Sequence, residues 1–172
     1  MAYILDTIGM VFHPEEIKNK FEEYYQYIDS VKESLPSGVY EWAITPWHYD
    51  PEDPRCPHDA WLESICIKEI TTDKDDPQTR HLEIHVRLIN GYHNGYIELL
   101  YQDVKSYNIT KQVDLRWGGT SPNQGHRDWL IDELRLSEHN LVLHEILFDG
   151  QTRWIIECKD IKYTWIPLIS SA

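Results

Sequence analysis

The stretch RHLEIHVRLI, residues 80–89, decides the fold class. Its apolar residues Leu82, Ile84, Val86 and Leu88 stand at every second position, with polar residues between them. Successive side chains of a β-strand point to opposite faces, so this period of two predicts a strand with one buried face and one face in water. Parallel strands are buried on both faces, so the alternation favours an antiparallel sheet.

Strand patterns continue along the chain on both sides of this stretch. Two Asn-Gly pairs at 90–91 and 94–95 predict one turn, and Asp149-Gly150 predicts a second hairpin. Strand-like runs occupy residues 39–44, 61–70, 80–89, 96–104, 129–136, 141–148, 152–158 and 161–166. Residues 107–109 and 113–117 are candidate short strands. A Pro-rich loop spans 45–57 and a polar loop spans 118–125. The pattern predicts seven to nine antiparallel strands.

Residues 14–35 carry the one clear helical pattern. Pro14 suits a first helical position, and Pro36-Ser37-Gly38 predicts the end. The spacing of the apolar residues builds one stripe with a period of 3.6: Ile17, Phe21, Tyr24, Tyr25, Ile28, Val31 and Leu35. The prediction is therefore an α+β fold, mostly β. One N-terminal amphipathic helix (about 14–35) packs on an antiparallel sheet of seven to nine strands, either curled or two-layered. No repeat or linker interrupts residues 1–172, so we expect one domain, with the β-rich region at 39–166.

The composition excludes several classes of partner. The 172 residues include 29 acidic and 16 basic side chains, a formal net charge of −13. Nucleic acid and anionic membrane surfaces are bound through Lys and Arg, so we expect neither partner. The N-terminus has no basic and apolar signal-peptide pattern, and no apolar run is long enough for a membrane span. Three cysteines without a close pair do not indicate a disulfide framework, and a cytoplasmic location is expected.

The acidity is uneven along the chain. Residues 1–58 carry a net charge of −7, residues 59–110 carry −4, and residues 111–172 carry −2. Trp47 lies in the Pro-rich loop among acidic residues, and an aromatic anchor ringed by acids is suited to a basic protein partner. The predicted partner-binding residues are Trp47, Tyr49, Asp50, Glu52 and Asp53 in the loop, and Glu15, Glu22, Glu23, Asp29 and Glu33 on the helix, with Glu22 and Asp29 as the leading helix positions.

Metal binding is the alternative hypothesis for the same loop. His48, Cys56 and His58 are possible zinc ligands, and Asp50 or Asp59 would complete a tetrahedral set. Their spacing matches no established zinc pattern. We therefore predict no cofactor, and keep zinc as the alternative.

No catalytic motif stands out, and the sequence favours a non-enzymatic function. The chain has no Gly-x-Ser-x-Gly nucleophile elbow. The neighbouring pairs Asp132-Glu133 and His144-Glu145 lie in predicted strands, where neighbours face opposite sides and cannot act on one substrate atom. In 129–136, strict alternation puts Trp129 opposite Asp132.

A small, acidic domain rich in Trp and Tyr resembles, in composition alone, the bacterial immunity proteins that neutralise basic nuclease toxins. The resemblance implies an inhibitor that works by occlusion and charge neutralisation. The main hypothesis is thus a binding protein for a basic partner. The alternatives are a metal-binding domain or metal-dependent enzyme, and a β-barrel or sandwich that binds a small molecule. The oligomeric state is left open.

Overall fold

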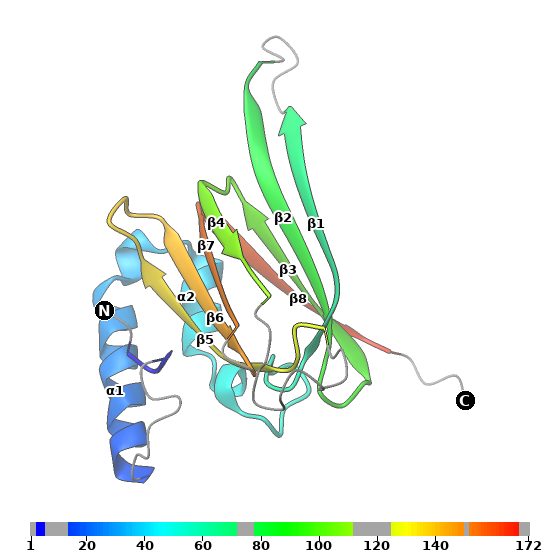
Figure 1. Cartoon of the computed structure of the whole chain (residues 1–172). Helices are drawn as coiled ribbons and strands as arrows, with labels where there is room; N and C mark the ends of the chain where they lie inside the picture. Colours follow the sequence, from blue (N-terminus) through cyan, green and yellow to red (C-terminus); the bar gives the residue numbers. More distant parts are fainter. Residues whose placement is uncertain (1–2, 6–13, 72–77, 112–124, 150–151, 169–172) are drawn as a thin grey trace.

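The computed structural model of the chain describes residues 3–5, 14–71, 78–111, 125–149 and 152–168. The strands form two four-stranded antiparallel sheets, ordered β1-β2-β3-β8 and β4-β7-β6-β5 (Figure 1). Their bounds are β1 Trp61–Thr71, β2 Arg80–Ile89, β3 Gly95–Gln102, β4 Ser106–Ile109, β5 Trp129–Leu136, β6 Val142–Phe148, β7 Arg153–Cys158 and β8 Asp160–Pro167. The predicted mostly-β α+β class is confirmed, in its two-layered form.

The inner faces of the two sheets share one hydrophobic core. Ile84 and Val86 of β2 are buried in it, as the alternation in 80–89 predicts. Phe148 of β6 and Trp154 of β7 enter the same core from the second sheet, with their ring centroids 4.8 Å apart. The core therefore lies between the two layers, as in a β-sandwich.

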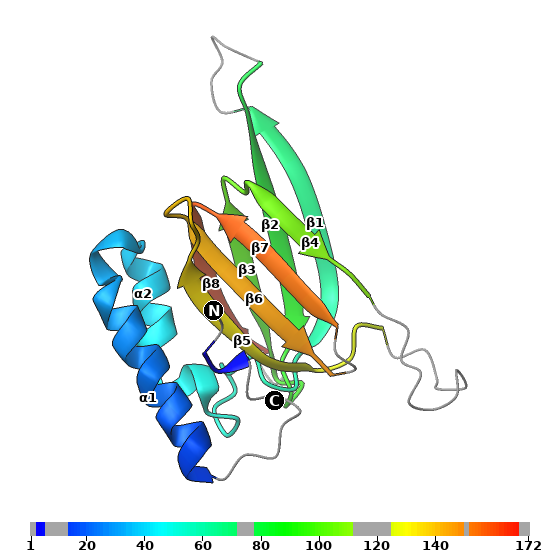
Figure 2. The same cartoon turned by 60° about the vertical axis from the view of Figure 1, so that its left-hand side comes forward.

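The helices lie beside the sandwich on the side of β5, as the two views agree (Figures 1 and 2). They are α1 Pro14–Ser30, the 3-10 turn η2 Lys32–Ser34, α2 Ser37–Ile44 and the 3-10 turn η3 Pro46–Tyr49. The predicted helix 14–35 is thus correct in place but ends earlier. The amide of Val31 already contacts both Tyr27 O and Ile28 O, which marks the change to the tighter 3-10 pattern.

The strand predicted for residues 39–44 is wrong, because this segment is helix α2. Val, Tyr and Trp favour strands, but Val39, Trp42 and Ala43 stand at i, i+3 and i+4 and are all buried. Pro36 precedes the helix and sets its first turn. Tertiary burial of this short stripe overrides the β propensity of its residues.

Two sequence predictions lie outside the described residues: the strand 113–117 and the loop 118–124. The other strands that the sequence predicts from residue 61 onward are present with small shifts at their ends. Within the described part of the chain, no helix is long and apolar enough to cross a membrane.

Candidate functional site

Strand β5 carries the centre of the candidate site. The pairing register of β5 with β6 shifts between Trp129 and Ile131, which marks a β-bulge. The bulge turns Trp129 and Asp132 to the same inner side, and Trp129 Nε1 donates a hydrogen bond of 3.1 Å to Asp132 Oδ1. The prediction from strict alternation, which puts these two residues on opposite faces, is therefore wrong.

Asp132 lies between two histidines inside the protein. Its Oδ2 is 2.9 Å from Nε2 of His48 in η3 and 3.0 Å from Nε2 of His144 in β6. Both imidazole side chains are fully buried, and the carboxyl group is 1% exposed. Nδ1 of His144 is 2.8 Å from the buried Tyr101 hydroxyl. The chain from Tyr101 to His48 is a continuous network of buried polar side chains.

The hydrogen-bond partners fix the protons in this network. Nδ1 of His48 is 3.1 Å from Trp42 O, and a carbonyl oxygen only accepts, so Nδ1 carries a proton. One further proton bridges Nε2 of His48 and Asp132, which makes this pair neutral as a whole. His144 donates from Nε2 to Asp132 and accepts at Nδ1 from Tyr101. Burial, the largest single influence, would raise the pKa of Asp132, but the charge of His48 and the bonds from both histidines hold that pKa well below its usual range.

Two tyrosines of α1 bond the free edge of β5. The Tyr24 hydroxyl donates to Leu134 O at 3.1 Å and accepts from Leu134 N at 3.0 Å. The Tyr27 hydroxyl accepts from Leu136 N at 2.9 Å. Burial raises the pKa of Tyr24, so its hydroxyl keeps the proton that it donates.

The loop after α2 continues the same row of contacts. The Tyr49 hydroxyl donates to Asp132 O at 3.1 Å, and Nδ1 of His58 donates to Leu130 O at 2.7 Å. Backbone bonds fix the loop to the start of β5, since Asp59 N donates to Trp129 O. We call the four side chains Tyr24, Tyr27, Tyr49 and His58 the β5 cap. They satisfy backbone groups that an edge strand otherwise offers to another strand.

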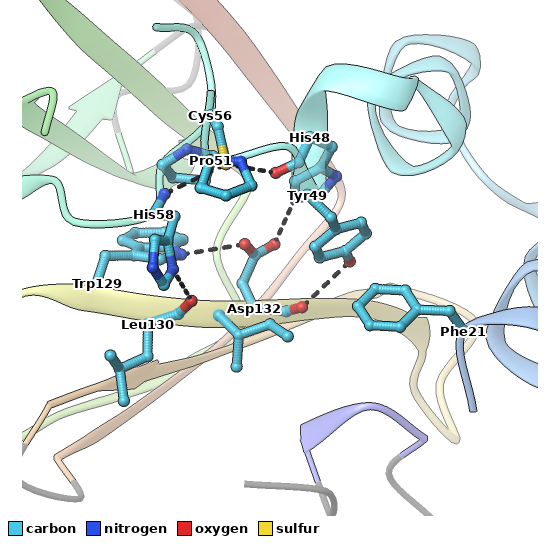
Figure 3. Close-up of a pocket in the computed structure, with 11 residues that line it drawn as sticks. Phe21, His48, Tyr49, Pro51, Cys56, His58, Trp129, Leu130 and Asp132 are labelled. Atoms are coloured by element: carbon cyan, nitrogen blue, oxygen red, sulfur yellow. Dashed lines mark hydrogen bonds and ion pairs between the residues drawn. The ribbon is translucent and has the colours of Figure 1, made fainter. Parts of the chain in front are cut away.

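A pocket of about 290 Å³ opens beside the β5 cap (Figure 3). Its lining is mostly apolar and aromatic: Phe21, His48, Tyr49, Pro51, Cys56, Pro57, His58, Trp129, Leu130, Ile131 and Asp132. The thiol of Cys56 donates to His48 O at 3.1 Å. Burial raises the pKa of Cys56 to about 11, so the residue is a neutral thiol and a poor nucleophile at neutral pH.

The structure does not assemble the proposed zinc ligands. Both ring nitrogens of His48 are engaged, by Trp42 O and by Asp132. His58 bonds the backbone of β5, and Asp59 is exposed with its carboxylate 3.5 Å from Nε2 of His58. Among the residues that the structure describes, no group of three or more His, Cys, Asp or Glu side chains is arranged to hold a metal ion.

The predicted partner-binding aromatic residues are less accessible than the sequence suggests. Tyr49 belongs to the β5 cap and stacks on His48, with ring centroids 4.1 Å apart. Trp47 is half-buried, packed on Tyr163 at 4.9 Å and under the guanidinium of Arg55 at 5.0 Å. Both side chains are only partly buried, so each keeps part of its surface in solvent.

The predicted acidic residues are mostly at the surface. Asp50 and Glu52 are exposed, whereas Asp53 is bonded to Arg55 at 2.6 Å. On α1, Glu22 is exposed 3.6 Å from Lys18, and Asp29 accepts a hydrogen bond from the Tyr40 hydroxyl. The other acids of residues 14–49 are exposed too: Glu15, Glu16, Glu23, Glu33 and Glu41. We call residues 14–53 the acidic helical segment, which holds ten acidic and three basic residues.

The second sheet, β4-β7-β6-β5, buries its acidic residues. Asp132, Glu133, Glu145 and Glu157 are all buried. Glu133 turns to the opposite face from Asp132, as the sequence predicts, and its Oε2 accepts from the amides of Tyr3 and Ile4 at 2.8 Å each. Among the described residues, nine of the thirteen exposed acidic residues belong to the acidic helical segment.

No protein-family model matches the chain, and no curated protein matches it. Sequence reasoning missed the structural roles of Asp132, His144, Tyr101 and the tyrosines of the β5 cap. The available signal was a polar residue at an inward position of a strand, because a buried polar group requires a partner. The identity of that partner had no local signal, since His48 and Asp132 are 84 positions apart.

Proposed function

We propose that this protein is a non-enzymatic binding protein, and that its acidic helical segment contacts a basic protein partner in the manner of a bacterial immunity-type inhibitor. The observation that carries the proposal is the exposure of this segment's carboxylates. Nine of its ten acidic residues are exposed, against three lysines. Concentrated charge of one sign speeds encounter with a partner of opposite sign and gives specificity.

The rigidity of the segment supports this proposal. The β5 cap fastens α1 and the loop after α2 to the sandwich through buried hydrogen bonds. Asp50 Oδ1 accepts from Glu52 N, so the loop that carries these two acids is locally ordered. A pre-ordered surface loses little entropy when it binds.

The chemistry of the buried network also favours binding over catalysis. A general acid or base must come within hydrogen-bond reach of its substrate, and Asp132, His48 and His144 each expose at most 1% of their surface. Their donors and acceptors bond one another, which is what a buried polar group requires for stability. We therefore assign the network to the support of η3 and of the loop that follows it.

Charge reversal tests the proposal directly. Affinity capture from source cells at rising NaCl concentration provides the partner, which is then purified for kinetics. The double variant Asp50→Lys, Glu52→Lys should lower its association rate about tenfold, because the steering charge is reversed. Raising the salt concentration should narrow the difference from the wild type, because salt screens exposed charges. Asp53 is left unchanged, since its pairing with Arg55 orders the loop.

Glu138→Lys is the matched control, because Glu138 is exposed in the turn between β5 and β6, outside the acidic helical segment. It should leave the association rate within a factor of two of the wild type. The proposal fails if binding is indifferent to salt, or if the control slows association as much as the double variant does. It also fails if no partner is retained at low salt.

A small-molecule ligand is the second candidate, and the pocket of about 290 Å³ favours it. Such sites are mostly apolar with a few oriented polar groups, and this lining fits that description. Trp129 lines the pocket, so its fluorescence should change when a ligand binds there. A fragment screen followed by Trp fluorescence tests this candidate, and Ile131→Trp should abolish any saturable change by filling the pocket.

A further inference from the structure

The edge strand β1 is largely exposed to solvent. None of its eleven residues, all of which the structure describes, is buried. Trp61 is 48% exposed and Ile67 is 43% exposed, although Ile67 stands on the inner face of its sheet. The β1–β2 hairpin extends past the shorter strands of the second sheet and lies away from α1 (Figures 1 and 2). A long, exposed edge strand with apolar residues is a template for another strand.

The backbone of β1 is free to pair. Asn90 N donates to Gly95 O, which identifies this as a hydrogen-bonded pair of β2 with β3. Hydrogen-bonded and non-bonded pairs alternate along an antiparallel ladder. The register then directs the amides of Cys66 and Lys68 to β2, and those of Ile65 and Ile67 to the open edge. No described segment bonds this open edge.

The charge balance of strands β1 and β2 favours a second copy of this chain as the partner. Strands β1 and β2 together carry three acidic and three basic residues, in a chain of net charge −13. Two of these acids are already paired with arginines of β2: Glu63 with Arg87 at 2.7 Å, and Glu69 with Arg80 at 3.0 Å. Two copies of this acidic chain repel least where charge-balanced strands meet, and helices α1 and α2, which carry most of the acidic helical segment, lie on the other side of the molecule (Figure 1).

We propose that β1 pairs antiparallel with β1 of a second copy of this chain, about a two-fold axis at Cys66. In this register Ile65 stands opposite Ile67 of the second copy, twice, and the four side chains form one apolar stripe. Lys68 stands opposite Ser64 of the second copy. Glu63 stands opposite Glu69 of the second copy, and each of these carboxylates is already paired with an arginine of β2. The two sheets join into one continuous eight-stranded sheet, and the exposed face of Ile67 is covered.

The register brings the Cys66 side chains of the two copies together. Cys66 occupies a non-bonded pair, where the Cα atoms are about 4.5 Å apart, and this separation permits a disulfide. Cys56 and Cys158 are buried, so Cys66 is the one exposed cysteine of the three. Copper-phenanthroline, which accepts the two electrons as two thiols join, therefore reports on this contact.

Sedimentation equilibrium over a hundredfold range of concentration tests the pairing. The wild type should rise to twice the monomer mass. Ile67→Pro should weaken dimerisation at least tenfold, because it removes an amide that points to the open edge, a position where edge strands tolerate proline. Ile67→Lys should have the same effect and retains the backbone amide, in case the proline variant does not fold. Thr164→Lys on β8, the other edge of the sheet, is the matched control and should dimerise like the wild type.

Three results would overturn the proposal. One is a wild type that stays monomeric over the whole range of protein concentration. This outcome covers the case in which β1 pairs with a strand of a different protein and not with a second copy. Another is a dimer that both Ile67 variants leave intact. The third is a dimer that oxidation does not cross-link through Cys66, with Cys66→Ser as the blank, because this excludes the proposed register. Loss of partner binding in the acidic helical segment would leave all three measurements unchanged.

Discussion

Two edge strands of this protein, β5 and β1, meet the same physical problem in different ways. Each ends a sheet and presents a row of backbone groups without a neighbouring strand. On β5, the hydroxyls of Tyr24, Tyr27 and Tyr49 and the imidazole of His58 bond that row. On β1, no described side chain does so.

The difference separates a structural edge from an interaction edge. The β5 cap comes from α1 and from the loop after α2, so closing this edge also fixes the acidic helical segment in place. The buried network of Asp132 reinforces the same junction from the inner side of β5. Among the described residues, no side chain of another element bonds the backbone of β1, which is held by its pairing with β2. Stability is therefore concentrated at β5, and β1 can accept a further strand at little cost to the fold.

Removal of the Asp132 carboxylate should have the largest effect on stability. Asp132→Ala leaves the donors of His48, His144 and Trp129 buried without an acceptor. The free energy of unfolding should fall by about 3–5 kcal/mol, as measured by urea denaturation. Glu69→Ala removes a carboxylate from β1 instead. Because that ion pair is exposed, its loss should be within the error of the same measurement. Equal losses in the two variants would refute the distinction between the edges.

The next largest effect should come from the cap itself. Tyr24→Phe removes one hydroxyl and leaves both Leu134 N and Leu134 O without a partner. A buried, unsatisfied group costs about 1–3 kcal/mol, so urea denaturation should show a loss in this range. Tyr25→Phe on the same helix is the matched control, since the structure gives its half-buried hydroxyl no hydrogen bond to a described residue. If the β5 cap contributes nothing to stability, Tyr24→Phe and Tyr25→Phe should have the same free energy of unfolding.

The sequence predicts the sheets better than it predicts this junction, for a physical reason. The alternation of 80–89 and the amphipathic stripe of 14–35 are local signals, and both correspond to elements of the structure. The segment 39–44 also holds a helical stripe, at Val39, Trp42 and Ala43. Here the β-prone side chains favour a strand, and the burial of the stripe favours a helix. Local propensity cannot rank the two without the surrounding core.

The candidate site was recoverable only in part. The alternation places Glu133 and Asp132 on opposite faces, which is correct, but a one-residue bulge hides that Trp129 and Asp132 share a face. Tyr49 is predicted as a surface anchor because tyrosine suits both interfaces and buried hydrogen bonds. The structure uses its hydroxyl for β5. These outcomes depend on contacts between residues far apart in sequence, for which a single sequence carries no pattern.

Acid should weaken the β5 junction more than the β1 hairpin. The pKa of Asp132 in the folded protein lies below its unfolded value of about 3.9. Its contribution to stability is therefore fully present above the unfolded pKa, and is lost as pH falls through the folded pKa. We expect the free energy of unfolding, measured by urea denaturation, to decrease as the pH drops below about 5, by at most about 1.4 kcal/mol per pH unit for this one group. Asp132→Asn should flatten this fall more than Asp103→Asn, although pairing with His81 also lowers the pKa of Asp103. If the two variants reduce the pH dependence of the free energy of unfolding equally, Asp132 is not the main acid-sensitive group.

The smallest expected effect compares two isoleucines that face each other across β1 and β2. Ile67 and Ile84 are register partners on the same side of the sheet, but Ile84 is fully buried and Ile67 is 43% exposed. Ile84→Val should cost about 1 kcal/mol, and Ile67→Val should stay within about 0.5 kcal/mol, when unfolding is followed at low protein concentration. Repeating both at high concentration sharpens the comparison. If β1 pairs with a second copy, the cost at Ile67 should grow with concentration, because the methyl group is then buried in the dimer, and the cost at Ile84 should not change. If Ile67→Val lowers the free energy of unfolding as much as Ile84→Val even at high dilution, this face of β1 is covered within the monomer. Strand β1 would then not be an open edge that contrasts with β5.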